Sequence, residues 1–130
     1  MGGITDRRNK VFVLDKELLF ALYLRLGSYD LVGARLETEG VVNPETGKAF
    51  SRAGVRTTVM KSEGYRDYFD RRDADPTLPD EPTTAEYALA AEIIKTRLPI
   101  QKEILAEVVR RKQQRLEDAE MYANYHAQQN

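Results

Sequence analysis

Residues 16–61 are expected to form three short helices in close succession, and this order limits the fold more than any other feature of the chain. Leucines recur at helical spacing after Asp15, which is a favourable N-cap, and Gly27 is a typical helix stop. A second helix is predicted over residues 28–40. A third begins after Ser51, with valines one turn apart on its inner side. The pattern therefore predicts a three-helix module.

The segments around the third helix are less regular. Residues 43–47 contain Pro and Gly at positions that favour a type I turn, and apolar residues flank them. Residues 41–50 can therefore form either a loop or a short wing-like hairpin, and residues 11–14 can form a strand or lead into the first helix. Gly64 is expected to interrupt the third helix. One further helical turn, packed back on the core, is predicted over residues 65–69.

Residues 75–82 mark the clearest boundary in the chain, because three prolines and three acidic residues fall within them. Such a composition is typical of a stiff, extended linker. We expect residues 1–83 to stay folded as a monomer when the remainder is deleted. The predicted organisation is a flexible arm over residues 1–10, the three-helix module over 11–73, a linker over 74–83 and a helical oligomerisation segment over 84–130.

Beyond the linker, a helix is predicted over residues 85–97, and Pro99 is expected to bend or break it. A long final helix is predicted over residues 100–125. Its apolar residues form a heptad-like stripe with Lys112 in the middle. The stripe fits an intermolecular coiled coil, and it fits equally a helix that folds back on residues 85–97 as a hairpin. The residues assigned to oligomerisation are Ile104, Leu105, Val108, Val109, Leu116 and Ala119.

The small inventory of reactive side chains argues against an enzyme. The chain has no cysteine, which excludes disulfides, thiolate metal ligands and cysteine nucleophiles and fits a reducing cytoplasm. Its single histidine, His126, lies in a polar tail, and no nucleotide-binding, hydrolase or metalloprotease motif occurs. No apolar run approaches the roughly 18 residues that cross a bilayer. We therefore expect an all-α, non-enzymatic protein with no catalytic residue, no metal, no cofactor and no membrane partner.

Basic side chains are concentrated around the third predicted helix, although the net charge of the chain is −1. From residue 48 to residue 72 there are seven basic and three acidic residues. Arg52 and Arg56 lie one helical turn apart, and a guanidinium can bind the O6 and N7 atoms of guanine in a DNA major groove. Double-stranded DNA is therefore the expected partner. The candidate DNA-binding residues are Lys48, Ser51, Arg52, Arg56, Thr57, Lys61 and Arg66, with Arg7, Arg8 and Lys10 in the arm.

Two segments carry a family resemblance. Residues 27–36 (GSYDLVGARL) and 51–59 (SRAGVRTTV) resemble the homeodomain-like helix-turn-helix of DNA-binding proteins from phages and mobile elements. The whole layout is similar to that of phage terminase small subunits. The resemblance implies a ring-shaped homo-oligomer that recognises viral DNA for packaging and regulates a large ATPase–nuclease subunit. Residues 85–125 would match the oligomerisation helices, although the turn before the third helix is longer here.

Two other interpretations stay open at this point. A dimeric helix-turn-helix transcriptional regulator would bind a palindrome as two copies rather than as a ring. A protein–protein adaptor or virion component would dock a partner through the three-helix module. Such an adaptor would show no salt-dependent affinity for DNA.

Overall fold

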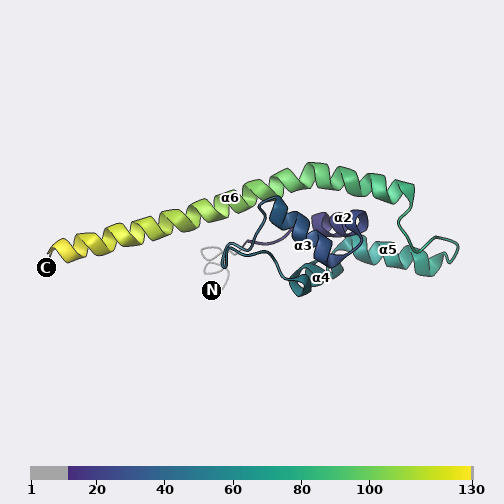
Figure 1. Ribbon diagram of the computed structural model, residues 1–130, viewed down its shortest axis with the longest axis horizontal. Helices are drawn as coiled ribbons and strands as arrows, with labels where there is room; N and C mark the ends of the chain where they lie inside the picture. Colours follow the sequence, from purple (N-terminus) through teal and green to yellow (C-terminus); the bar gives the residue numbers. More distant parts are fainter. Residues whose placement is uncertain (1–11, 130) are drawn as a thin grey trace.

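The computed structural model describes residues 12–129, and within that range it contains five α-helices and no strand. The prediction of an all-α fold is therefore confirmed. The N-terminal arm lies outside the described residues. The helices are α2 (Lys16–Leu26), α3 (Tyr29–Thr38), α4 (Arg52–Met60), α5 (Glu63–Ala74) and α6 (Thr84–Gln129), shown in Figure 1.

Side-chain caps begin the four short helices. The Asp15 carboxylate accepts hydrogen bonds from two N–H groups in the first turn of α2, and Ser28, Ser51 and Ser62 each accept one in α3, α4 and α5. Each cap satisfies backbone donors that have no partner inside their helix. Gly27 ends α2 with a φ of 86°, which is a conformation that other residues rarely adopt. The predicted N-caps Asp15 and Ser51 and the stop at Gly27 are confirmed.

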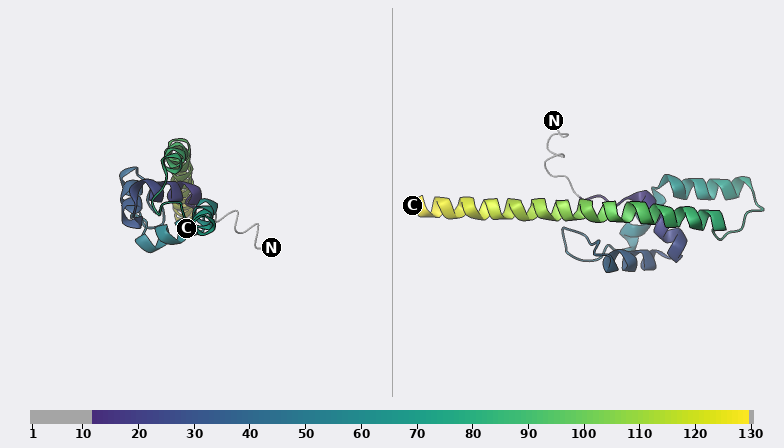
Figure 2. Two further views of the ribbon diagram at one scale, coloured as in Figure 1. Left: turned by 90° about the vertical axis from the view of Figure 1, so that its right-hand side faces the viewer. Right: turned by 90° about the horizontal axis from the view of Figure 1, so that it is seen from above.

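Helices α2–α5 pack together as one body, and α2 lies at its centre. It packs against α3, α4 and α5 as well as α6, with α6 on one side and α4 on the other (Figures 1 and 2). The core is formed where α2 meets its neighbours, and burying these aliphatic side chains supplies the main driving force for folding. The fully buried side chains are Leu18, Leu19, Leu22, Val32, Leu36, Val41, Val55, Val59 and Ser62.

Helix α6 has two different halves. Its first half lies along α2 and contributes Leu98 and Leu105 to the same core, each about 7% exposed. Its second half projects from the body as an isolated helix (Figures 1 and 2). The predicted segment 84–130 thus contains both a component of the core and a free helix.

Pro99 lies inside α6 without ending it, so the alternative in which residues 100–125 fold back on residues 85–97 as a hairpin is wrong. Proline removes one hydrogen bond and costs roughly 3 kcal/mol in a helix interior. Because Pro99 has no N–H, the carbonyl of Lys95 lacks its hydrogen bond inside the helix. Both residues are exposed, so water can bind this carbonyl instead. Leu98 and Gln101 are buried on the opposite side and hold both parts of α6 against the body. Tertiary packing therefore outweighs the local preference, and α6 curves without breaking (Figure 1).

Helix α5 is also longer than predicted. The chain turns between α4 and α5 at Lys61 and Ser62, and Gly64 lies inside the first turn of α5 instead of ending α4. The Glu17 carboxylate of α2 accepts hydrogen bonds of 2.9 Å from the N–H groups of both Glu63 and Gly64. This long-range cap explains the extra length, because spacing along the sequence does not reveal a cap supplied by another helix.

Residues 41–50 form a loop, which is the first of the two alternatives that the sequence left open. The Asn43 side chain accepts a hydrogen bond from the N–H of Glu45, and the Asn43 carbonyl accepts one of 2.7 Å from the N–H of Gly47. Across the loop, the N–H of Asn43 donates a hydrogen bond of 2.9 Å to the carbonyl of Lys48. Val41 is anchored in the core at the beginning of this loop. The local turn bonds therefore replace strand pairing.

The acidic segment before α6 is fastened at several points. The Arg72 guanidinium donates to the carbonyls of Pro79 and Glu81 and to the Glu86 carboxylate, with a shortest ion-pair distance of 2.6 Å. It also lies 3.6 Å from the centre of the Tyr68 ring. This clasp, formed by Tyr68, Arg72 and Glu86, joins the last turns of α5 to the start of α6. The hydrogen bonds from Arg72 lower the pKa of Glu86 to about 2.

Candidate nucleic-acid interface

The outer face of α4 is oriented by its buried inner face. Val55 and Val59 are fully buried against the core, as predicted. Ser51 caps the helix by accepting a hydrogen bond of 3.1 Å from the N–H of Gly54. Arg52, Arg56 and Thr57 are consequently exposed. A short helix fixed by two buried valines can present its outer side chains to a DNA groove without moving them far.

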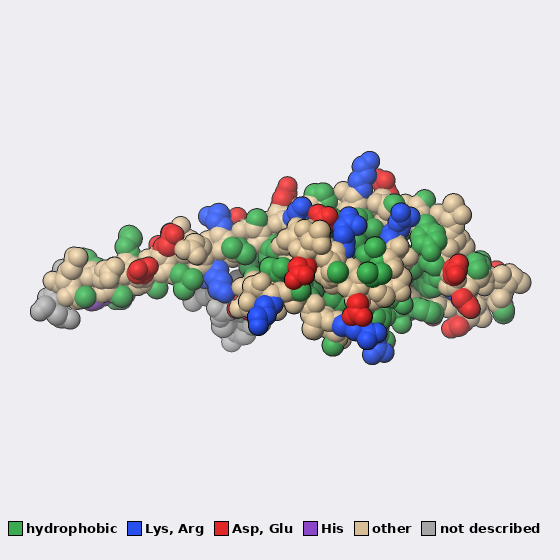
Figure 3. Space-filling model, viewed as in Figure 1, with side chains coloured by type: hydrophobic (Ala, Val, Ile, Leu, Met, Phe, Trp, Pro, Cys, Tyr) green, Lys and Arg blue, Asp and Glu red, His purple; other side chains and the backbone are tan. Residues whose placement is uncertain are grey.

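Four exposed cations around α4 have no ion-pair partner among residues 12–129. Elsewhere in the body, basic side chains are commonly paired with carboxylates, as in the Arg97–Asp15 and Lys102–Glu39 pairs. A cation without a protein partner can bind phosphate without first losing an ion pair. Figure 3 shows Lys and Arg side chains at the lower edge of the body, where α4 lies in Figure 1. The four residues are Lys48, Arg56, Lys61 and Arg66.

Arg52 differs from these four because it faces Asp30 of α3. Its Nε atom lies 3.7 Å from the Asp30 carboxylate, and both side chains are about 70% exposed. An ion pair this open contributes little to stability, so Arg52 can exchange it for a ligand. Asp30 is the residue that sequence reasoning missed at this site. Its place beside α4 depends on how α3 and α4 cross, which spacing along the chain does not reveal.

The aromatic residues of α5 belong mainly to the core. Tyr68 is buried, packs edge-to-face on Phe20 and donates a hydrogen bond of 2.7 Å to the carbonyl of Asp80. Tyr65 also packs on Phe20, with an interplanar angle of 85°. Both rings are thus held in the aromatic packing around Phe20, and the Arg72 guanidinium covers the Tyr68 ring. These contacts give Tyr65 and Tyr68 a structural role.

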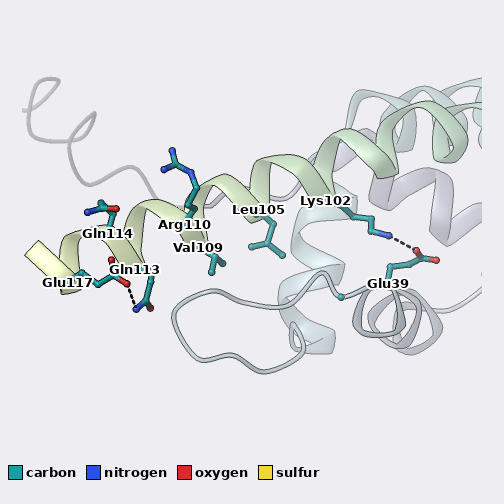
Figure 4. Close-up of a pocket in the computed structure, with 10 residues that line it drawn as sticks. Glu39, Lys102, Leu105, Val109, Arg110, Gln113, Gln114 and Glu117 are labelled. Atoms are coloured by element: carbon teal, nitrogen blue, oxygen red, sulfur yellow. Dashed lines mark hydrogen bonds and ion pairs between the residues drawn. The ribbon is translucent and has the colours of Figure 1, made fainter.

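The residues assigned to oligomerisation divide into two groups. Leu105 is buried in the core of its own chain, so it serves the fold first. The others lie toward the surface: Val108 is half-buried, and Ile104, Val109, Leu116 and Ala119 are exposed. A shallow groove runs beside this part of α6, between the helix and the end of α3. Figure 4 shows Leu105 and Val109 pointing into it, with Glu39 opposite.

Other classes of site are not evident in the described part of the chain. No group of three or more His, Asp or Glu side chains among residues 12–129 is placed to hold a metal ion. None of the helices described is both long and apolar enough to span a membrane. The candidate residues Arg7, Arg8 and Lys10 lie outside the described residues. Comparisons with protein-family models, curated proteins and solved structures found no match.

Proposed function

We propose that this chain is a non-enzymatic, double-stranded DNA-binding protein that places α4 in the major groove. The observation that carries the proposal is a set of four exposed cations on α4 and in the segments flanking it that have no ion-pair partner among residues 12–129: Lys48, Arg56, Lys61 and Arg66. Counterion release from DNA would make such a surface bind, and it would make the affinity fall with salt concentration. In this interpretation α2, α3 and α4 form a helix-turn-helix module.

The candidate DNA-binding residues would have two roles: some would position the protein on the DNA backbone, and others would recognise bases. Lys48, Lys61 and Arg66 would contact phosphates and set the register of the helix on the duplex. Arg52 and Arg56 project from one side of α4, one turn apart, and would read guanine in the groove. Thr57 would contact a thymine methyl or a phosphate, and Ser51 directs the N-terminus of α4 toward the backbone. One such module binds weakly by itself, so α6 would supply avidity by joining several copies.

The resemblance to phage terminase small subunits extends the proposal to viral genome packaging. Recognition of packaging DNA by several joined copies would then be coupled to a large ATPase–nuclease subunit as partner. The residues that support this extension are the segments 27–36 and 51–59 together with the helical layout of α6. A dimeric regulator with a palindromic target would use the same α4 surface, and the number of copies separates the two.

The decisive experiment measures binding to a labelled mixed-sequence duplex at two salt concentrations, with the mass of the complex followed by light scattering. Arg56→Ala is expected to weaken specific binding by roughly 1–3 kcal/mol. Lys61→Ala is expected to weaken it for all sequences and to reduce the salt slope by about one. Lys95→Ala is the matched control, because Lys95 is an exposed cation on α6, on the other side of α2.

Each outcome points to a different function. A ring-sized oligomer that shifts on DNA at low salt supports the packaging proposal, and a complex of two chains supports a regulator. No binding at either salt concentration removes DNA as a partner and leaves the adaptor. Equal losses in Arg56→Ala and Lys95→Ala would mean that α4 is not the binding surface.

A further inference from the structure

The second half of α6 has no packing partner in its own chain. From Gln113 to Gln128 every described side chain is exposed, and this part of the helix projects away from the body (Figures 1 and 2). It nevertheless carries large apolar side chains, among them Leu116 at 57% exposure and Tyr122 at 68%. An isolated helix of this length gains most of its stability from packing an apolar face. The apolar face of the second half of α6 is therefore expected to pack against another chain.

One stripe along α6 is arranged symmetrically about Leu116. Its members follow spacings of three and four residues, so they lie on one side of the helix. Lys112 and Glu120 lie four residues before and after Leu116. Val109 and Ala123 lie seven residues before and after it. The complete stripe reads Leu105, Val109, Lys112, Leu116, Glu120, Ala123 and Ala127.

The charged residues of this helix are also arranged about Leu116, with basic residues before it and acidic residues after it. Residues 110–115 contain four bases and no acid, and residues 117–120 contain three acids and no base. In a parallel, in-register pair the basic block would face the basic block of the other copy. In an antiparallel pair centred on Leu116, each basic block faces an acidic block. Like charges in direct contact are unfavourable and opposite charges favourable, so the pattern selects the antiparallel arrangement.

The groove beside α6 fits the end of such a partner. Leu105, Val109 and Gly40 line it, and Glu39 lies across from Leu105 and Val109 (Figure 4). In the antiparallel arrangement Val109, which is 49% exposed, lies opposite Ala123 of the other copy, whereas Leu105 is buried in its own core. A large exposed side chain would thus meet a small one, which allows two helices to approach closely.

We infer that two copies of this chain pair through α6, antiparallel, with a two-fold axis at Leu116. The contact is isologous, because Val109 of either copy meets Ala123 of the other, and only Leu116, on the axis, meets its own counterpart. It deepens the proposed function, in which α6 joins several copies: an isologous pair closes at two copies, so a ring would need a second contact. The pairing itself does not depend on DNA. The pair would hold the two bodies, and with them the two α4 surfaces, on either side of the axis.

Cysteine cross-linking tests the antiparallel arrangement. Because the chain has no natural cysteine, any disulfide must come from the introduced residues. A mixture of Val109→Cys and Ala123→Cys chains is expected to form a disulfide-linked heterodimer on mild oxidation without DNA. Each variant alone is expected to form none, because its two copies lie about 21 Å apart at 1.5 Å per residue and a disulfide needs Cα atoms within about 7 Å. Disulfides from Ala123→Cys alone would mean a parallel pair and would overturn the inference.

Charge reversal gives a second, independent test. Glu120→Lys is expected to weaken self-association at least about tenfold by facing Lys112 of the other copy, and adding Lys112→Glu is expected to restore it. Within its own chain Lys112 donates to the Pro44 carbonyl at 3.1 Å and lies 3.9 Å from the Glu45 carboxylate, so thermal unfolding of Lys112→Glu alone is measured beside the pair. Glu103→Lys is the matched control, since the same change lies on an exposed position of α6 outside the stripe. Sedimentation or light scattering reads the result. A monomer at all concentrations, or equal effects of Glu120→Lys and Glu103→Lys, would overturn the inference; a larger assembly that still gives the Val109–Ala123 cross-link supports it.

Discussion

Gln101 of α6 accepts a hydrogen bond of 2.6 Å from the backbone N–H of Asp15, the N-cap of α2. The Gln101 amide also donates to the carbonyl of Val13 at 3.4 Å, and Arg97 pairs with the Asp15 carboxylate at 2.9 Å. The buried side chain of Gln101 thus joins the first half of α6 to the start of α2. This contact joins Gln101, in the predicted C-terminal segment, to Asp15, in the predicted three-helix module.

Replacing Gln101 should therefore destabilise the whole body. Gln101→Leu keeps the volume roughly but leaves the N–H of Asp15 without its partner, and an unsatisfied buried donor costs about 1–3 kcal/mol. Gln114→Leu is the control, because Gln114 is exposed and bonds only to Asp118 of the same helix. Urea unfolding followed by circular dichroism measures both. Equal free energies of unfolding for the two variants would contradict a role for Gln101 in joining the segments.

Truncation tests the shared core directly. The sequence predicts that residues 1–83 fold alone, but Leu98 and Leu105 belong to the core around α2. We now expect deletion of residues 84–130 to leave a largely unfolded chain, since removing even one large buried side chain costs about 2–5 kcal/mol. Deletion of residues 114–130 should leave the body folded. Thermal unfolding and helical content, measured by circular dichroism, distinguish the two truncations. A cooperative unfolding transition in residues 1–83 would mean that this segment folds alone, as the sequence predicts.

Structural features that depend on residues close in sequence could be predicted, whereas features that depend on contacts between distant residues could not. The caps at Asp15 and Ser51, the stop at Gly27 and the inner face of α4 follow from local chemistry and helical period. The continuity of α6 through Pro99 does not, because buried side chains on either side of the proline outweigh its local cost. Within the candidate site, the exposure of Arg56 follows from the position of Val55 and Val59, whereas the approach of Asp30 does not.

Gly64 should tolerate no larger residue. An added Cβ atom there would lie 2.7 Å from the Phe20 ring and 3.0 Å from the Glu17 carboxylate. Because both groups are held in the body, Gly64→Ala is expected to destabilise the fold by roughly 1–3 kcal/mol. Gly33→Ala is the comparison: its Cβ would meet only the Phe50 carbonyl at 3.6 Å, an ordinary contact. In helix α3 that change should stabilise by about 0.5–1 kcal/mol. Denaturant unfolding of both variants measures the contrast in sign.

The clasp of Tyr68, Arg72 and Glu86 should make stability depend on acid. The folded pKa of Glu86, about 2, lies below its ordinary value of 4.5. Its stabilisation is therefore complete above pH ~4.5 and is lost as the pH falls toward 2; it amounts to roughly 3 kcal/mol at most. Glu86→Gln should lower the free energy of unfolding at neutral pH and flatten its decline between these limits.

Glu107→Gln provides the control for this pH dependence. Hydrogen bonds from Arg110 and Arg111 also lower the pKa of Glu107 to about 2, but its ion pairs lie on the exposed surface of α6. Solvent screens such pairs, so this variant should retain the pH dependence of the unaltered protein. If Glu86→Gln unfolds with the unaltered pH profile, the clasp contributes little to stability.

Asp30 offers a gain-of-affinity test of the proposed DNA surface. Its carboxylate is the acidic group nearest Arg52 and would repel a phosphate brought to α4. Asp30→Asn should raise DNA affinity roughly twofold to fivefold at low salt, equivalent to about 0.5–1 kcal/mol, with a smaller gain at high salt. Glu92→Gln removes the same charge from an exposed position on α6 and should change affinity little. Anisotropy titrations with one duplex measure both. An equal gain in the two variants would reflect net charge alone and would count against α4 as the reading helix.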